Sequence, residues 1–272
     1  MKQTVFFISD GTGITAETLG HSLLSQFEQV EFEQITIPYV DTEEKALAVI
    51  NQINTCAQQS GQKPLVFATL VSPVIRKHIN SCHGVLMDFF NTFIGPLEQI
   101  LQVKSSHHVG RTHGMLNYDT YKSRMDAVNY SLTTDDGMNI KQFESADIIL
   151  IGVSRCGKTP TCLYLALQFG IYAANYPFTD DDMDKMSLPS FLAIHHEKLF
   201  GLTIKSKRLQ SIRNERRPNS NYASAEQCEK EIQSMEKLFR RENIPFLDAT
   251  VHSIEELSTS ILAMTGLKRR LF

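Results

Sequence analysis

Three absences limit what kind of protein this sequence encodes. There is no charge excess, because 27 basic and 30 acidic residues leave a formal net charge of -3, so charge alone attracts the chain neither to nucleic acid nor to anionic membranes. No apolar run approaches the roughly 20 residues that span a bilayer. The five cysteines form no CxxC pair, which argues against a zinc site or a disulfide framework. We therefore expect no nucleic-acid partner, no membrane partner and mostly reduced thiols.

The chain is long enough for two modest domains or one large domain. It has 272 residues, of which 42% are hydrophobic and 21% charged, as in an ordinary globular protein. Its apolar N-terminal stretch ends at Asp10, too early for the hydrophobic region of a signal peptide. We therefore expect a cytoplasmic protein, and a homodimer is an assembly that the sequence leaves open.

The first part of the chain alternates between strand and helix patterns. Short runs rich in β-branched and aromatic residues predict strands at 4–9, 32–37, 65–71 and 85–88. Apolar spacing and turn residues predict helices at 14–27, at 43–58, from 72 onward and at 96–101. Such alternation favours a parallel sheet covered by helices on both faces. We expect an α/β domain over residues 1–104, with a Rossmann-like or flavodoxin-like parallel sheet.

A connecting segment and a second α/β domain follow. Residues 105–145 begin with a polar stretch that contains three histidines in no zinc-binding pattern, and continue with a helix at 118–132 and a turn at 133–137. The alternation then restarts. Strands are predicted at 147–153, 173–178, 199–204 and 244–249, and helices at 160–169, 225–242 and 253–264. We expect residues 146–272 to form a P-loop kinase-like domain, for the reason given next.

The stretch GVSRCGKT fits the phosphate-binding pattern G-x-x-x-x-G-K-[ST]. Glycines let backbone N–H groups turn around phosphate oxygens, and the following helix presents its positive end to the same anion. Lys158 would reach the terminal phosphates, and the Thr159 hydroxyl would hold Mg²⁺. The flanking strand and helix favour this interpretation over a tight turn with an incidental lysine. The candidate nucleotide ligands are Gly152, Val153, Ser154, Arg155, Cys156, Gly157, Lys158 and Thr159.

A basic segment, KSKRLQSIRNERR, lies where small P-loop kinases carry a mobile lid. Its arginines would offer planar donors to phosphates, and the alternative is a solvated basic helix. The candidate lid residues are Arg208, Arg213, Arg216 and Arg217. No strand ends in an obvious Mg²⁺-binding aspartate; TDDDMD at 179–184 and Asp248 are weak candidates for that role.

Two further acidic motifs allow a functional and a structural interpretation. Asp135 and Asp136 are adjacent carboxylates that suit Mg²⁺ binding or activation of a hydroxyl nucleophile, although an Asp-Gly turn explains them as well. SDGTGITAE, at 9–17, would be a second anion site, but we favour capping of the following helix by Asp10 or Thr12.

Several motifs together resemble one family, the pyruvate, water dikinase regulatory proteins, also called phosphoenolpyruvate synthase regulatory proteins. They are GVSRCGKTPTCLYLA with YKSRMDAVNYSLTTDDG before it, NYPF, LFGLTI and IRNERR after it, and the N-terminal SDGTGITAE. The resemblance spans nearly the whole chain, and its S-R-x-G-K-T-P extension is more specific than the generic loop pattern.

The resemblance implies a bifunctional serine/threonine kinase and phosphorylase. Such a protein phosphorylates a threonine of the dikinase with ADP as donor and inactivates it. It also removes that phosphate with inorganic phosphate as acceptor, releasing pyrophosphate. The target is recognised when its neighbouring catalytic histidine carries phosphate. The nucleotide loop of the family corresponds to Gly152–Thr159 here, and Mg²⁺ is the expected metal.

Three residues are candidates for catalytic roles. Lys158 would act on the charge of the transferred phosphoryl group, and Asp136, in the family's D-D-G, would position or deprotonate the attacking oxygen. Arg155 would fill or reorganise the pocket for a γ-phosphate, unless it is a structural arginine paired with an acid. Two positions depart from the family: Thr134 where histidine is common, and Cys162 where serine is frequent.

Two other functions remain open at this point. One is a small-metabolite P-loop kinase that uses ATP, and the other is a non-catalytic nucleotide-sensing module. Transfer from ADP to a protein would favour the regulator, turnover of a metabolite with ATP would favour the kinase, and binding without turnover would favour the sensor.

Overall fold

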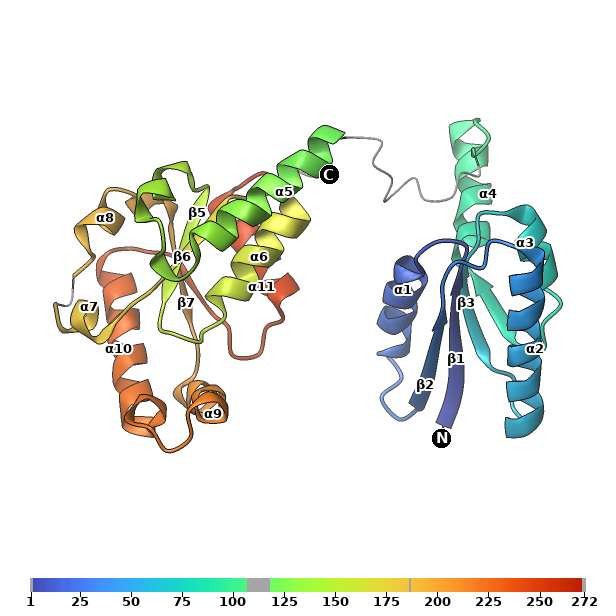
Figure 1. Ribbon diagram of the computed structural model, residues 1–272, viewed down its shortest axis with the longest axis horizontal. Coiled ribbons are helices and arrows are strands. Elements are labelled where there is room, and N and C mark those ends of the chain that lie inside the picture. The colour runs from blue at the N-terminus through green and yellow to red at the C-terminus, as the bar shows by residue number, and fades with distance from the viewer. Residues whose placement is uncertain (1, 107–117, 186, 271–272) are drawn as a thin grey trace. The chain divides into compact units, whose positions relative to one another are not determined.

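The computed structural model describes residues 2–106, 118–185 and 187–270. The chain divides into two compact units, Met1–Leu116 and Asn117–Phe272. Each unit has its own four-stranded sheet in which every pairing is parallel, with helices against it (Figure 1). The α/β class predicted from the alternating pattern is therefore confirmed.

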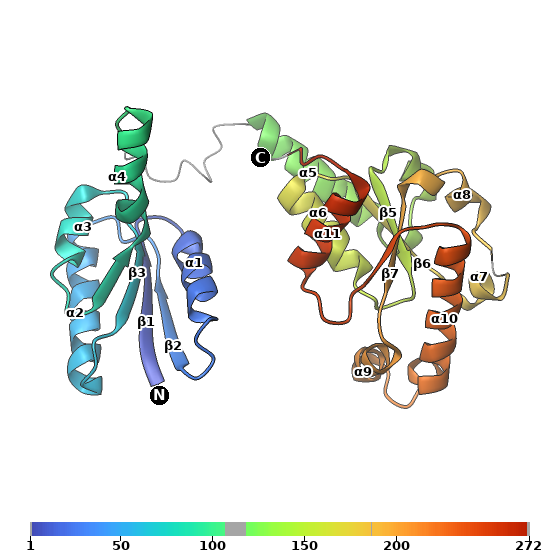
Figure 2. The same cartoon turned by 180° about the vertical axis from the view of Figure 1, so that it is seen from behind.

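The sheet of the first unit has the strand order β2-β1-β3-β4. The strands are β1 (Lys2–Ser9), β2 (Glu31–Ile37), β3 (Leu65–Thr69) and β4 (Val85–Asp88), and the helices are α1 (Ile14–Leu24), α2 (Glu43–Ser60), α3 (Pro73–Ile79) and α4 (Phe89–Leu101). Alternate residues of β1 face opposite sides, so Phe6 and Ile8 pack with α2 and α3 while Val5 and Phe7 pack with α1. Both views show α1 on one side of this sheet and α2 and α3 on the other (Figures 1 and 2).

Local capping explains where most of these helices begin. The Thr42 side chain accepts a hydrogen bond from Lys45 N at the start of α2, and Ser72 caps α3, which has Pro73 in its first turn as predicted. The helix predicted at 96–101 begins earlier, at Phe89, where Asp88 caps it. The prediction took Pro96 for a helix start, but Pro96 lies inside α4.

The sheet of the second unit has the strand order β6-β5-β7-β8. Its strands are β5 (Ile148–Gly152), β6 (Ala173–Pro177), β7 (Leu199–Thr203) and β8 (Phe246–Asp248). Its α-helices are α5 (Tyr118–Thr133), α6 (Lys158–Phe169), α7 (Asp180–Lys185), α8 (Ser190–Ala193), α9 (Ser206–Arg216), α10 (Ala225–Arg241) and α11 (Ile254–Thr265), with short 3₁₀ helices η1 (Asp135–Gly137), η2 (Ile140–Ser145), η3 (His196–Lys198) and η4 (Asn221–Ala223). Helices α5, α6 and α11 lie on one side of the sheet and α10 on the other (Figures 1 and 2).

The segment expected to connect two domains, residues 105–145, is divided in the structure. Residues 107–117, which include the three histidines, lie outside the described residues. Helix α5 is part of the second unit, where it contacts α6 and β6 and where the Ser131 hydroxyl donates to Ala173 O at 2.8 Å. The turn after α5 continues along β6, where Asp136 N donates to Asn175 Oδ1. None of the described helices is long and apolar enough to cross a membrane.

Gly20 provides a test of packing in the first unit. A Cβ at this buried position of α1 would lie 2.2 Å from a ring carbon of Phe7 and 3.1 Å from Phe67. Because both rings belong to the core, we expect Gly20→Ala to destabilise the unit by about 1–3 kcal/mol. The matched control is Gly95→Ala in α4, where a Cβ meets nothing within 4 Å. Hydrogen exchange of β1 and α1 peptides in the full chain measures the effect; equal protection in both variants would contradict this account.

Candidate active site

The loop between β5 and α6 has the strand–loop–helix context that the sequence predicts. Its first glycine, Gly152, packs so closely against β7 that a Cβ would lie 2.3 Å from Leu202 O. Two later residues have left-handed backbones, Arg155 with φ 76° and Gly157 with φ 96°. Position 152 therefore requires glycine. Arg155 has a left-handed backbone, which costs free energy for a residue with a Cβ but not for glycine.

Lys158 is the first residue of α6, and its side chain is turned back into the loop. It is 4% exposed, and its ammonium group donates to Val153 O at 2.8 Å, with Cys156 Sγ at 3.9 Å. The amino end of a helix carries a partial positive charge, and the lysine adds a full one. The loop therefore has the electrostatic character of an anion site.

Asp135 connects the turn after α5 to this loop. Its Oδ1 accepts hydrogen bonds from the Thr159 hydroxyl at 2.7 Å and from Asn175 Nδ2 at 2.6 Å. Asn175, fully buried at β6, also accepts from Asp136 N at 3.2 Å. The two predicted acidic and loop motifs, 24 residues apart, are thus brought together, and the residue in contact is Asp135.

Asp136 has a different environment from its neighbour. Its side chain is exposed, and its backbone is left-handed with φ 49°. Gly137 follows with φ 77°, and a Cβ there would lie 2.7 Å from the Tyr176 ring, so this turn needs its glycine. Thr134, in the family's histidine position, is fully buried and donates its hydroxyl proton to Tyr130 O at 2.8 Å. The motif therefore offers one engaged carboxylate and one exposed carboxylate.

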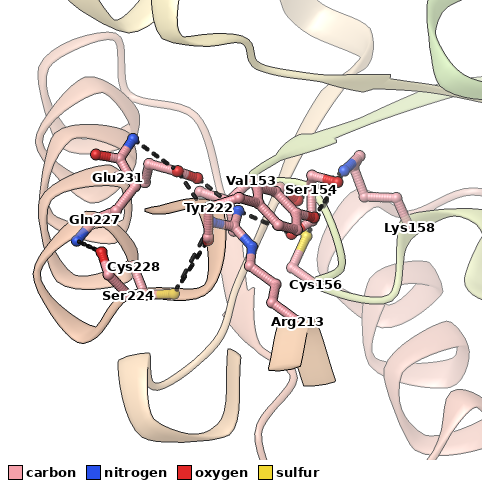
Figure 3. Close-up of polar contacts among 10 residues, drawn as sticks. All are labelled: Val153, Ser154, Cys156, Lys158, Arg213, Tyr222, Ser224, Gln227, Cys228 and Glu231. Carbon is pink, nitrogen blue, oxygen red and sulfur yellow. Dashed lines mark hydrogen bonds and ion pairs between the residues drawn. The ribbon is translucent and has the colours of Figure 1, made fainter. Parts of the chain in front are cut away.

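The four candidate lid arginines lie in two different environments. Arg208, Arg216 and Arg217 are exposed, on or just after α9. Arg213 is 0% exposed and forms an ion pair with Glu231 of α10 at 2.6 Å. It also donates to Ser154 O in the loop at 3.2 Å (Figure 3). The expectation of an exposed phosphate donor at Arg213 therefore differs from what the structure shows, because apolar spacing around Leu209 turns this face of α9 inward.

The comparisons with known proteins fit this arrangement. A family profile described as kinase/pyrophosphorylase matches residues 5–262. The chain belongs to the kinase/pyrophosphorylase family. Three full-length relatives, each provisionally named a phosphoenolpyruvate synthase regulatory protein, are similar to it. The relative from Legionella pneumophila (strain Corby) is 56% identical over 271 residues, and the match covers 100% of both chains. The relative from Marinobacter nauticus is 54% identical over 269 residues, and the one from Pseudomonas putida (strain W619) is 53% identical over 270 residues. Each of these two matches covers 99% of both chains. The resemblance indicated by the motifs is confirmed.

Other acidic candidates of this family member have local structural roles. Asp182 accepts from Tyr176 Oη at 2.9 Å and from Thr179 N at 3.1 Å, which stabilises the start of α7. Burial, together with the bond to Asp182, raises the pKa of Tyr176 to about 12. Asp248 accepts from the backbone and the hydroxyl of Thr250 and so closes a turn after β8. Neither carboxylate has a described contact with the loop.

The N-terminal SDGTG motif does not cap α1 in the way expected. Gly13 is the cap residue of α1, and no side chain caps it. Asp10 is buried instead, and its Oδ2 accepts from Val71 N at 2.6 Å and Ser72 N at 3.0 Å. The carboxylate therefore ties the end of β1 to the segment after β3.

Three neighbours of the loop were given no role by the sequence. Asn175 begins the NYPF motif of the resemblance but was assigned no contact, and Glu231 and Tyr222 lie in polar segments without a motif. Cys162, in the family's serine position, is a buried thiol that donates to Ala174 O at 3.4 Å. Burial raises its pKa well above the usual range of a thiol, so it stays protonated.

Proposed function

We propose that this protein is a bifunctional regulator of phosphoenolpyruvate synthase, also called pyruvate, water dikinase. It phosphorylates a threonine of that enzyme with ADP and removes the phosphate with inorganic phosphate. The observation that carries the proposal is the convergence of Lys158, Thr159 and the Asp135–Asp136 pair at one edge of the second sheet. The names of the full-length relatives supply the target.

In the kinase direction the threonine oxygen would attack the β-phosphorus of ADP. The bond between that phosphorus and the bridging oxygen breaks, AMP leaves, and the threonine proton passes to a base. Lys158 would hold charge on the transferred group, as a loop lysine does in phosphoryl transfer. Asp136 is exposed beside the loop-bound Asp135 and is the carboxylate free to take the proton.

In the reverse direction an oxygen of inorganic phosphate would attack the phosphorus of phosphothreonine. The threonine oxygen leaves with a proton, and pyrophosphate is released. In-line transfer places the attacking phosphate opposite the threonine oxygen, which is where the α-phosphate of AMP stands in the kinase direction. One phosphate subsite in the loop therefore serves both reactions.

The donor set beside Thr159 fits Mg²⁺. Mg²⁺ takes oxygen ligands and keeps several waters and substrate phosphates, and Thr159 and Asp135 supply a hydroxyl and a carboxylate. Because the Thr159 hydroxyl donates its proton to Asp135, the lone pairs of the hydroxyl oxygen remain for a cation. Among the described residues no cluster of three His, Cys, Asp or Glu could hold a metal by itself, so nucleotide phosphates would complete the set. Bound Mg²⁺ would neutralise charge on those phosphates.

The exposed arginines would contribute to binding of the target. Arg208, Arg216 and Arg217 offer planar donors close in sequence to the loop-bound Arg213. A phosphorylated histidine on the target carries the negative charge that such donors bind. Arg155 is exposed in the loop and forms no ion pair with any described residue, which supports its proposed place beside the phosphates.

The decisive experiment is a donor test with the histidine-phosphorylated target. The protein is incubated with β-labelled ADP or with γ-labelled ATP, each freed of the other nucleotide. We expect label on a target threonine from ADP, release of AMP, and pyrophosphate on later addition of phosphate. Threonine phosphorylation from ATP alone would overturn the donor assignment, turnover of a small metabolite would indicate a metabolite kinase, and binding without turnover would indicate a sensor.

Lys158→Ala tests the shared loop. We expect at least a 10³-fold loss in both directions, because each transfers a phosphoryl group whose charge this lysine would stabilise. Kinase and phosphorylase rates are measured on the purified variant, with circular dichroism to check folding. Lys230→Ala, an exposed lysine of α10, is the control and should keep its rates. Near-normal activity of Lys158→Ala in either direction would contradict the proposal.

The aspartate pair separates two roles. Asp136→Asn should lower the rate about 10²-fold or more at saturating Mg²⁺, since it removes the base. Asp135→Asn keeps a polar side chain and should chiefly raise the Mg²⁺ concentration needed for half-maximal rate, since it weakens the hydroxyl–carboxylate pair. Rates over a Mg²⁺ titration distinguish the variants. The assignment would be reversed if Asp135→Asn alone lost rate at every Mg²⁺ concentration.

A further inference from the structure

Arg213 is among the largest fully buried side chains of the protein, and it contacts three segments at once. Its guanidinium pairs with Glu231 of α10 through two bonds, NH2 to Oε2 at 2.6 Å and NH1 to Oε1 at 3.0 Å. NH1 also donates to Tyr222 O at 2.9 Å, and NH2 donates to Ser154 O at 3.2 Å. The Tyr222 ring lies 4.0 Å from the guanidinium carbon. Figure 3 shows the group between α10 and the loop.

A buried ion pair contributes little net stability when it joins two helices. Taking both charges out of water costs several kcal/mol per ion, and apolar side chains of similar volume often do as well or better. The arrangement has one feature that an apolar pair would lack, which is a donor directed at the loop backbone. The planar fork lets one side chain pair with Glu231 and bind Ser154 O at the same time.

Fixing the Ser154 carbonyl also fixes the next amide. The peptide between Ser154 and Arg155 is planar and trans, so its C=O and N–H point in opposite directions. With the oxygen held toward Arg213, the Arg155 N–H must point away from the guanidinium. This peptide precedes the left-handed residue Arg155, whose φ of 76° costs about 1 kcal/mol for a side chain with a Cβ. The loop therefore needs an external contact to keep this conformation.

A second contact holds the same residue. Tyr222 Oη donates to Ser154 Oγ at 3.1 Å, so the side chain and the carbonyl of Ser154 are both bound by the α9–η4 region. Glu231 is in turn held by Gln227 Nε2 at 3.0 Å. Loop, α9 and α10 are thus joined through hydrogen bonds that reach the loop at Ser154.

We propose that Arg213 is a positioning residue that sets the Ser154–Arg155 peptide so that the Arg155 N–H faces the bound phosphate. The proposal rests on the proposed function in one respect, that the anion is the phosphate chain of the nucleotide or pyrophosphate. It also assigns α9 a fixed place against the loop, with its exposed arginines carried at a constant position rather than on a mobile lid.

Two variants that each alter the same ion pair separate positioning from stability. Arg213→Lys keeps a positive charge for Glu231, but one ammonium group cannot replace the fork and should lose the Ser154 contact. Glu231→Gln weakens the pair and leaves the Arg213–Ser154 bond in place. We expect the dissociation constants for ADP and for pyrophosphate to rise about tenfold in Arg213→Lys, because binding must then order a loop that has lost a charge-assisted hydrogen bond, and by less than about threefold in Glu231→Gln. Arg240→Lys, at a surface pair on α10, is the control.

The dissociation constants are measured by titration calorimetry well below the unfolding temperature of each variant. A variant that is merely less stable is then still folded, and its dissociation constants stay unchanged. In turnover the Michaelis constant for ADP should rise in Arg213→Lys with the maximal rate within about threefold. Equal affinities in wild type and Arg213→Lys, or equal losses in Arg213→Lys and Glu231→Gln, would overturn the proposal.

The loop conformation gives a test that is independent of activity. In a crystal structure of the full-length Arg213→Lys variant we expect Arg155 to leave the left-handed region or to adopt more than one conformation, with Glu231→Gln unchanged. A loop that superimposes on the wild type would overturn the positioning role. If the wild-type protein binds neither ADP nor pyrophosphate, the proposed function fails, and the loop structures alone decide whether Arg213 positions the peptide.

Discussion

A single carboxylate oxygen, Oδ1 of Asp135, brings three parts of the second unit to one point. It accepts from Thr159 in the first turn of α6 and from Asn175 at β6, while the carboxylate itself belongs to the turn after α5. Each bond is charge-assisted and short, and the site is half-buried, which strengthens the interaction relative to water. Among the described residues it is the hydrogen bond that links this turn to α6.

Local patterns were enough to predict the loop and its flanking elements. A buried strand, two glycines and an apolar helix occupy consecutive residues, so β5, the loop and α6 follow from neighbours in the sequence. Local patterns could not show which of Asp135 and Asp136 contacts the loop. That depends on left-handed backbones at Asp136 and Gly137, which turn adjacent side chains to different environments.

The basic segment shows that a charge pattern, too, does not predict contacts made in the tertiary fold. Four arginines within ten positions predict a solvated face or a lid, and three of them are exposed as that pattern implies. Arg213 is buried because its partner, Glu231, is 18 residues away on another helix. A charge pattern along one segment cannot report a counter-charge that only the tertiary fold supplies. The contact of Asn175 was missed for a related reason, since the NYPF motif does not show that this amide donates to Asp135, 40 residues away.

The two sheets have the same strand order and yet only one carries the loop. In each, the first and third strands of the unit are neighbours, β1 with β3 and β5 with β7. Ligands of open α/β sheets bind at the carboxyl ends of two such strands, where the strand order reverses. In the first unit Asp10 accepts from Val71 N and Ser72 N across this position, so the backbone donors there are already used by the protein.

In the second unit no described carboxylate accepts from the backbone at the equivalent position. Gly152 lets β5 approach Leu202 O closely, and the chain continues into a loop whose outer side is held by Arg213. Ser154 accepts hydrogen bonds from outside the loop, at its carbonyl from Arg213 and at its hydroxyl oxygen from Tyr222, while Lys158 donates to Val153 O within the loop. The same strand order thus gives two different edges: one where an aspartate accepts from the backbone N–H groups, and one where a close-packed glycine and an external arginine shape a loop that would suit an anion.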